Sequence, residues 1–292
     1  MNTFIIFILR EVNDKMNILY CGDKNIEKGL IISVLSLLKN CRTQLSIYVL
    51  TVDIQYGSNI YKPISEEVIN YLNYEVKLYN PLNFVKIIDI TREFNSAIPI
   101  ANMHTRFTPC CMLRLYADMI TELPDKILYL DNDVICSKDI YEFYSRDVSN
   151  CEVLGVLDYY GSWIFHNNLF KRDYINSGVL LMNLHKIRLT GLFEKCRKLC
   201  INKKMFMPDQ SAINKLSVYK ICADRKYNEQ RKLQSNTVLQ HFTTSFRLFP
   251  FIHTIKVKPW EIDKVHNILH LYEYDELLNE YTNFISRLDM SH

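Results

Sequence analysis

Short apolar runs alternate with longer segments of helical periodicity along most of the chain. The apolar runs, which are typical of buried strands, predict strands at 17–21, 46–52, 84–90, 126–130, 153–157, 179–183, 218–222 and 238–242. The polar residues 176–178 are expected just before one of these strands. Helical spacing and helix-start residues predict helices at 26–38, 65–78, 108–120, 189–200, 207–211 and 269–288, with a loop at 56–63. Strand–helix–strand units form parallel sheets through right-handed crossovers. We therefore expect an α/β fold with a Rossmann-like, mostly parallel central sheet flanked by helices.

Length and composition fit one folded domain. The 292 residues are 48% hydrophobic and 23% charged, without a linker, an internal repeat or a low-complexity tract. We expect a single domain over 16–292 that ends in a C-terminal helical segment covering the sheet. Met16 directly precedes the first convincing strand, so residues 1–15 are expected to be a loose extension or a misassigned start. The apolar run 4–9 is too short to span a bilayer and lacks the features of a signal peptide.

Net charge and cysteine content bear on which partners and which cellular compartment the sequence predicts. A formal net charge of +3 is too small to indicate a nucleic-acid partner. The 9 cysteines include no Cys-x-x-Cys pair and favour a reducing compartment over a disulfide framework. Because the C-terminal segment mixes charges, it is not a basic membrane anchor, and membrane contact is expected to be peripheral at most.

Two carboxylates follow the apolar run 126–130, because Asp131 and Asp133 flank Asn132. Ligands of open α/β sheets bind at the carboxyl ends of the strands. Two carboxylates at such a position repel each other unless a cation lies between them, and oxygen ligands suit Mg²⁺ or Mn²⁺. The pattern thus predicts a divalent metal site that holds a phosphate; the alternative is an exposed turn rich in Asp and Asn.

Other polar residues stand at strand ends and helix starts. Asp23 and Asn25 follow the first strand without a Gly-rich phosphate motif, so they offer side-chain hydrogen bonds to a base or ribose. The local sequence favours another interpretation, in which they cap the next helix. A capping role also explains Asp209, and Arg114 either reaches a phosphate or extends its charge to solvent.

Together, and in this order, these features resemble glycosyltransferase family 8 from Met16 to about Trp260. The matching motifs are the segments 17–25, Leu113-Arg-Leu-Tyr116, Ile127-Leu-Tyr-Leu-Asp-Asn-Asp133, Tyr174-Ile-Asn-Ser-Gly-Val-Leu-Leu-Met-Asn183, Pro208-Asp-Gln-Ser211, His241-Phe242 and Lys258-Pro-Trp260. The sequence is most similar in character to bacterial lipopolysaccharide galactosyl- and glucosyltransferases, with glycogenin-like enzymes more distant.

The resemblance implies a GT-A fold that binds a nucleotide-diphosphate sugar. It implies Mn²⁺, with Mg²⁺ as the alternative, a UDP-galactose or UDP-glucose donor, and a retaining transfer that gives an α-linkage. By motif position the metal ligands would be Asp131, Asp133 and His241. The donor would contact Cys21, Asp23, Asn25 and Asn132 at uridine, Arg114, Asp158, Asn176, Ser177, Asp209 and Gln210 at the sugar, and Lys258 at the diphosphate.

Retention of configuration leaves two mechanisms open. A covalent intermediate would need a nucleophile beneath the anomeric carbon. The matched position there carries Gln210, whose amide is a poor nucleophile. We therefore favour a front-face displacement, in which Gln210 stabilises positive charge and the departing phosphate oxygen helps to deprotonate the acceptor. Asp209 or Asp158 as a transient nucleophile is the alternative.

The chain departs from the family pattern between His241 and Lys258. This interval is longer than in many relatives, contains no glycine and is rich in Phe. Because glycine is what permits close backbone approach, we expect the backbone amides near the diphosphate to be placed differently. The insertion 242–257 would form an acceptor wall, a lid or a hydrophobic plug.

The leading function is therefore a metal-dependent UDP-hexose transferase that acts on an oligosaccharide or lipid-linked glycan. Such an enzyme would be cytoplasmic, or peripheral at the inner face of the membrane, and would build lipopolysaccharide or another surface polysaccharide. The alternatives are a glycogenin-like initiator that glucosylates its own Tyr, a nucleotide-sugar-binding protein without turnover, and a carbohydrate-binding module.

Overall fold

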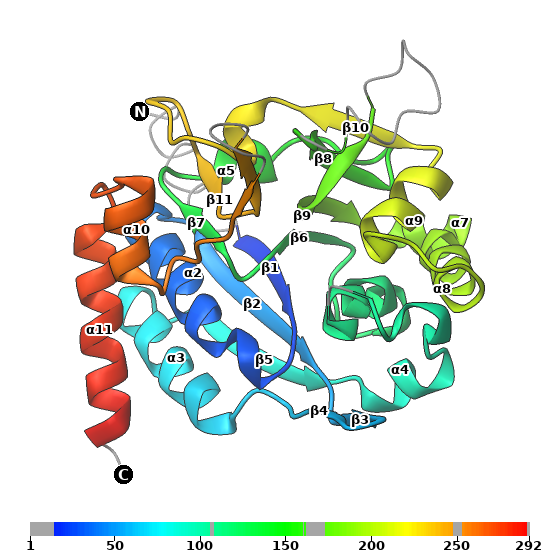
Figure 1. The fold of residues 1–292 in the computed structure, drawn as a ribbon, viewed down its shortest axis with the longest axis horizontal. Helices are drawn as coiled ribbons and strands as arrows, with labels where there is room; N and C mark the ends of the chain where they lie inside the picture. The colour runs from blue at the N-terminus through cyan, green and yellow to red at the C-terminus, as the bar shows by residue number, and fades with distance from the viewer. Residues whose placement is uncertain (1–14, 106–107, 160, 162–172, 248–252, 291–292) are drawn as a thin grey trace, which may run out of the picture.

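A seven-stranded mixed sheet forms the centre of the molecule, with strand order β10-β8-β9-β6-β1-β2-β5 (Figure 1). The computed structural model describes residues 15–105, 108–159, 161, 173–247 and 253–290. The strands of the sheet are β1 Lys15–Cys21, β2 Gln44–Thr51, β5 Phe84–Asp89, β6 Lys126–Leu130, β8 Val153–Leu157, β9 Ile175–Asn183 and β10 Lys220–Ala223. All neighbours pair in parallel except β9, which is antiparallel to both β6 and β8. The predicted α/β fold with a mostly parallel sheet is confirmed.

Helices cover both faces of this sheet, because its central strands are apolar on each side. One face packs against α2 Glu27–Asn40 and α3 Glu66–Tyr79. The other face packs against the 3₁₀ helix η3 Pro109–Met119 and the helices α7 Leu184–Thr190, α8 Leu192–Asn202 and α9 Pro208–Leu216. The other helices of the described residues are α4 Thr91–Ser96, α5 Tyr141–Tyr144, α10 Ile262–Leu269, α11 Asp275–Met290, and the 3₁₀ turns η1 Lys24–Ile26, η2 Ile100–Asn102 and η4 Arg225–Tyr227.

Three short antiparallel ribbons complete the described part of the chain. They pair β3 Ile54–Tyr56 with β4 Asn59–Tyr61, β7 Val134–Cys136 with β11 Leu239–His241, and β12 Ser245–Arg247 with β13 His253–Ile255. The last ribbon shows that the insertion 242–257 contains a strand pair, while residues 248–252 lie outside the described residues. Among the described residues no helix combines the length and the apolar character needed to cross a membrane.

Several predicted boundaries were wrong for local reasons. The loop expected at 56–63 forms part of the β3–β4 hairpin, where Gly57 takes a positive φ of 60°. The helix expected at 189–200 is interrupted at Gly191, which separates α7 from α8 with a φ of 65°. The helix expected at 108–120 is present, but as the 3₁₀ helix η3 Pro109–Met119 with Thr108 at its N-cap. A single residue with a left-handed backbone ends a helix. The spacing of polar and apolar residues does not show such a break.

The C-terminal helical segment also differs from its prediction. It consists of α10 and α11, which are separated near His270 with a φ of 51°. Instead of covering the sheet, α11 packs outside α2 and α3 (Figure 1), where the buried ring of Phe284 lies 4.6 Å from the ring of Tyr71. Residues 1–14 lie outside the described residues, and β1 begins at Lys15.

The contact between α11 and α3 should contribute measurably to stability. We expect Phe284→Ala to lower the free energy of unfolding by about 3 kcal/mol, because truncating a buried Phe loses transfer free energy and leaves a cavity. Urea denaturation followed by circular dichroism measures this change. The adjacent exposed residue supplies a control, Asn283→Ala, which should change stability by less than about 0.5 kcal/mol. Equal effects of both substitutions would contradict the docking of α11 through Phe284.

Candidate active site

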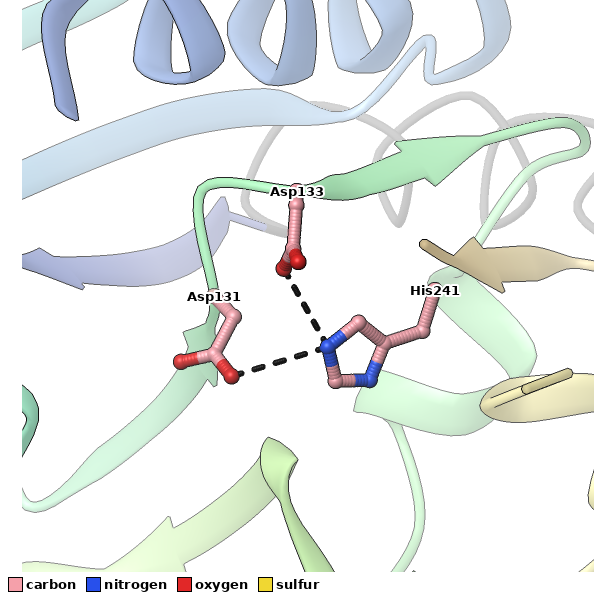
Figure 2. A group of neighbouring side chains, drawn as sticks. All are labelled: Asp131, Asp133 and His241. Atoms are coloured by element: carbon pink, nitrogen blue, oxygen red, sulfur yellow. Dashed lines mark ion pairs between the residues drawn. The ribbon is translucent and has the colours of Figure 1, made fainter. Parts of the chain in front are cut away.

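A cluster of two carboxylates and one imidazole lies at the carboxyl end of β6. Asp131 and Asp133 occupy the turn between β6 and β7, and His241 ends β11, which pairs with β7 so that His241 is opposite Val134. The Nε2 atom of His241 lies 3.2 Å from Asp133 Oδ1 and 3.6 Å from Asp131 Oδ2 (Figure 2). One ligand atom from each residue lies within 4.8 Å of the others. The residues predicted as metal ligands are thus brought together.

Asp133 is buried, at 6% exposure, and remains ionised. Burial acts to raise the pKa of this carboxyl, but Lys258 and His241 outweigh that effect and hold its pKa well below the ordinary value. The ammonium group of Lys258 contacts Asp133 Oδ2 and donates to the carbonyl oxygen of Phe242 at 3.1 Å. Lys258, expected at the diphosphate, therefore lies beside the carboxylate pair despite the insertion that precedes it.

The donor set and its surroundings fit a divalent cation. Carboxylate oxygens and one imidazole nitrogen are suitable ligands for Mn²⁺. Gly178 of β9 leaves the room that the cluster needs, because an added Cβ would overlap His241 Cε1 and lie 2.7 Å from Asp131 Oδ2. The alternative of an exposed Asp-rich turn is excluded by the burial of Asp133 and His241.

Arg114 connects the carboxylate pair to the next group of polar residues. It is 3% exposed, its Nη2 lies 2.8 Å from Asp131 Oδ1, and its Nε lies 3.3 Å from Asp209 Oδ2. The guanidinium carbon lies 3.9 Å from the ring centroid of Tyr129, whose hydroxyl donates to Asp131 Oδ1 at 2.6 Å. Arg114 and Tyr129 thus hold Oδ1, which leaves Oδ2 of Asp131 facing His241. The alternative that Arg114 reaches solvent is excluded.

Tyr129 lies within the matched motif 127–133 but was not predicted as a residue of the site. A signal for it exists, because residues two positions apart in a strand point to the same face, and Tyr129 precedes Asp131 by two. Burial raises the pKa of Tyr129 well above its ordinary value, so its hydroxyl remains a hydrogen-bond donor.

The three residues Asp158, Asn176 and Gln210 form a buried hydrogen-bonded group. Asp158 Oδ2 accepts from Gln210 Nε2 at 3.0 Å and from Asn176 Nδ2 at 2.9 Å. Gln210 Oε1 accepts from the backbone nitrogen of Ser177 at 3.0 Å. The polar residues 176–178, expected to precede a strand, lie within β9, and this strand brings them to the start of α9.

The capping roles favoured by the local sequence are wrong for both Asp209 and Asp23. Asp209 lies inside the first turn of α9, and its Oδ2 accepts from Ser177 Oγ at 3.0 Å. Asp23 makes no capping hydrogen bond with its side chain, is 2% exposed and accepts from Asn25 Nδ2 at 2.6 Å. Burial raises the pKa of Asp23, against the opposing effect of the Asn25 hydrogen bond.

The remaining predicted residues, Cys21 and Asn132, also lie at the carboxyl ends of β1 and β6. Cys21 ends β1, the parallel neighbour of β6, and burial raises the pKa of its thiol. An added Cβ at Gly29 of α2 would overlap the Asn132 side chain and lie 2.6 Å from the Trp260 ring. This close approach packs α2 against the turn between the two aspartates and against the segment that carries Lys258.

Asn228 is a residue of the site that the sequence did not indicate. It is fully buried, its Oδ1 lies 3.1 Å from His241 Nδ1, and its Nδ2 donates to Asn176 Oδ1 at 3.0 Å. If Nδ1 of His241 carries the proton, Nε2 presents its lone pair to the carboxylates, as a metal ligand must. Asn228 follows η4 and precedes His241 by 13 residues. It belongs to none of the matched motifs, so no signal in the sequence indicated its role.

Glycosyltransferases are among the solved structures that share this fold. An active-site mutant of LgtC superposes with a TM-score of 0.65 at 17% identity, over 92% of this chain and 95% of that one. LgtC, a galactosyltransferase solved with donor and acceptor sugar analogs, gives a TM-score of 0.61 at 18% identity, over 91% of this chain and 96% of that one. The architecture is therefore the GT-A fold.

The sequence profile of glycosyl transferase family 8 matches residues 17–264, so the chain belongs to glycosyltransferase family 8. A lipopolysaccharide 1,2-glucosyltransferase of Escherichia coli is 26% identical over 226 residues, which cover 74% of this chain and 62% of the relative. Lipopolysaccharide glucosyltransferase WaaO of Escherichia coli K12 is 27% identical over 261 residues, or 84% of this chain and 72% of the relative. The chain thus spans less than two thirds of the first of these relatives.

The room at Gly178 gives a direct test of the metal site. We expect Gly178→Ala to abolish Mn²⁺ binding, measured by electron paramagnetic resonance of free Mn²⁺, because the added methyl group displaces His241 from the carboxylates. Gly57→Asn is the control, since that position faces open space and Asn tolerates its positive φ. Unchanged Mn²⁺ affinity in a folded Gly178→Ala protein would contradict the site.

The contact of Asn228 with His241 gives a second test. Asn228→Ala should weaken Mn²⁺ binding by about 10-fold to 100-fold, as expected when a ligand loses its orienting partner. Asn228→Asp keeps an oxygen acceptor for His241 Nδ1 and should retain more of the affinity, although it loses the donor to Asn176. Titration of Mn²⁺ into each folded variant measures the difference. Equal losses in both variants would indicate that Asn228 supports packing and not the orientation of His241.

Proposed function

We propose that the protein transfers galactose or glucose from a UDP-sugar to a glycan acceptor, with retention of configuration, to form an α-linkage. The observation that carries this proposal is the position of Arg114 in a family 8 chain. Its guanidinium bonds Asp131 of the metal cluster and Asp209 beside Gln210. The buried guanidinium of Arg114 thus connects the proposed metal and diphosphate site to the polar residues proposed to bind the donor sugar.

The donor would lie along the carboxyl ends of β1 and β6. We assign uridine to Asp23 and Asn25, with Cys21 and Asn132 alongside, and the diphosphate to Lys258. The ion held by Asp131, Asp133 and His241 would be Mn²⁺, with Mg²⁺ as the alternative, and it would offset the negative charge of the diphosphate leaving group. Lys258 places its positive charge next to Asp133, a proposed metal ligand. There it would help to offset the charge that develops on the diphosphate as the glycosidic bond breaks.

The hydrogen bonds of the sugar-binding residues support the front-face mechanism. Asp158 accepts from two amide groups, and Asp209 accepts from Ser177 and pairs with Arg114. Carboxylate oxygens that already accept hydrogen bonds or pair with a cation are weaker nucleophiles. We propose that Asp158 and Asn176 orient Gln210 and the donor sugar, while a phosphate oxygen of the leaving group accepts the proton of the acceptor hydroxyl.

The names of the relatives favour a lipopolysaccharide or another surface polysaccharide as the product. Two of them are described as lipopolysaccharide glucosyltransferases, which supports an oligosaccharide or lipid-linked acceptor. Selection between glucose and galactose depends on one hydroxyl and hence on one hydrogen bond. A cytoplasmic or membrane-peripheral location remains a prediction of the sequence.

Calorimetric titration with UDP-glucose and UDP-galactose tests the donor class. We expect one sugar nucleotide to bind with Mn²⁺ and to lose affinity by at least about tenfold, or about 1.4 kcal/mol, when the metal is chelated. Asp131→Ala should abolish the metal-dependent part, because it removes one ligand and leaves Arg114 without this partner. The control is Asp53→Ala, because Asp53 is exposed and its ion pair with Lys62 lies at the surface.

Absence of Mn²⁺-dependent binding for both sugar nucleotides would refute the UDP-hexose assignment. The same samples, incubated with donor alone, can be examined by intact mass. A gain of one hexose on the protein would contradict the front-face transfer to a separate acceptor and would favour a covalent intermediate or a self-glucosylating initiator. An unchanged mass together with donor turnover would agree with the proposal.

A further inference from the structure

A second, positively charged pocket of about 360 Å³ lies on the connection between β10 and β11. Its wall carries Arg225, Lys226, Arg231 and Lys232 against the single carboxylate of Glu229, with Gln234 and Asn236 as neutral polar neighbours. The four cations and one carboxylate give this basic pocket a net charge of +3, equal to the formal charge of the whole chain.

Only part of this charge is neutralised within the protein. Arg225 Nη2 lies 2.5 Å from the buried Glu229 Oε1, and Lys226 Nζ lies 3.1 Å from Glu142 Oε2 outside the pocket. Over the part of the chain that the structure describes, no ion pair with a carboxylate is found for Arg231 or Lys232. These two side chains are exposed, and they leave charge available to a ligand.

The guanidinium groups are held in place around one aromatic ring. The guanidinium carbons of Arg231 and Arg225 lie 4.6 Å and 5.2 Å from the ring centroid of Tyr159. Arg231 Nη1 also donates to the Tyr159 hydroxyl at 2.9 Å, and Glu229 Oε1 accepts from the backbone nitrogen of Arg231 at 2.8 Å. Glu229 already balances the charge of Arg225, so the guanidinium of Arg231 is the one left to a ligand. An ordered guanidinium fork is suited to a phosphate or a carboxylate.

Two hydrogen bonds connect the segment of the basic pocket to residues of the proposed reaction centre. The carbonyl oxygen of Glu229 accepts from the backbone nitrogen of His241 at 2.9 Å. On the other side, Tyr159 directly follows Asp158, and its backbone nitrogen donates to Gln230 Oε1 at 3.0 Å. The pocket wall is thus attached both to the strand that carries a metal ligand and to the residue after the proposed sugar-binding carboxylate.

We propose that the basic pocket binds an anionic group, a phosphate or a carboxylate, carried by the acceptor glycan next to the sugar that is modified. This inference rests on the proposed function, since an acceptor must approach Asp158 and the metal cluster from outside. Arg231 and Lys232 would bind the anion, and the amides of Gln234 and Asn236 are suited to neighbouring sugar hydroxyls. The acceptor would then be an acidic or phosphorylated saccharide.

The test occupies the donor site first, so that a phosphate probe cannot bind there. Protein saturated with Mn²⁺ and UDP is titrated with glucose 6-phosphate, glucuronate or glucose, and binding is followed by ligand-observed NMR. We expect at least one anionic probe to bind tenfold or more tightly than glucose at low salt, with the preferred probe showing which anion is recognised. Arg231→Gln combined with Lys232→Gln should remove this preference while leaving UDP affinity unchanged.

A matched control separates a local pocket from general electrostatics. Lys203→Gln combined with Lys204→Gln makes the same change in charge at the exposed end of α8 and should leave the preference intact. Equal binding of all three probes to the wild-type protein, or equal losses in both double variants, would overturn the pocket while UDP binding upholds the donor site. Failure of UDP and Mn²⁺ to bind would instead refute the proposed function, and the acceptor role with it.

Discussion

The concentration of negative charge at the end of β6 is the constraint on which the rest of the site depends. Asp131 and Asp133 are one residue apart at the edge of an apolar sheet, where neither can be left without a cationic partner. Arg114 binds one oxygen of Asp131, and Lys258 binds Asp133. His241 approaches the remaining oxygens from β11. Each partner comes from a different part of the chain, so the charge balance also ties those parts together.

The antiparallel strands β9 and β11 bring the partners of the two aspartates to the end of β6. Because β9 runs against β6, its polar start meets the end of β6, and Gly178 reaches the aspartates without a side chain in the way. The pairing of β11 with β7 delivers His241 in the same manner. A purely parallel sheet would have placed the start of β9 at the opposite edge, away from the metal cluster.

One network of buried polar residues runs from the metal cluster to the surface. Asn228 contacts both His241 and Asn176, and the next residue, Glu229, orders the arginines of the basic pocket. A metal ligand, a group suited to a donor sugar and a cationic surface pocket therefore share one short segment after η4. Buried networks of this kind are rigid when every member has a partner, so the proposed acceptor pocket and metal site are expected to keep a fixed relation.

The sequence by itself determined the alternation of strands and helices, the family and the residues at the strand ends, because apolar periodicity and motif order are local properties. It could not determine the helix break at His270, which takes a left-handed backbone without being a glycine. Nor could it decide whether Asp23 and Asp209 cap helices or turn inward, since a cap and a buried partner require the same residue type. Only the tertiary structure decided these points and brought Asn228 to His241, because contacts between distant segments follow from strand order and packing.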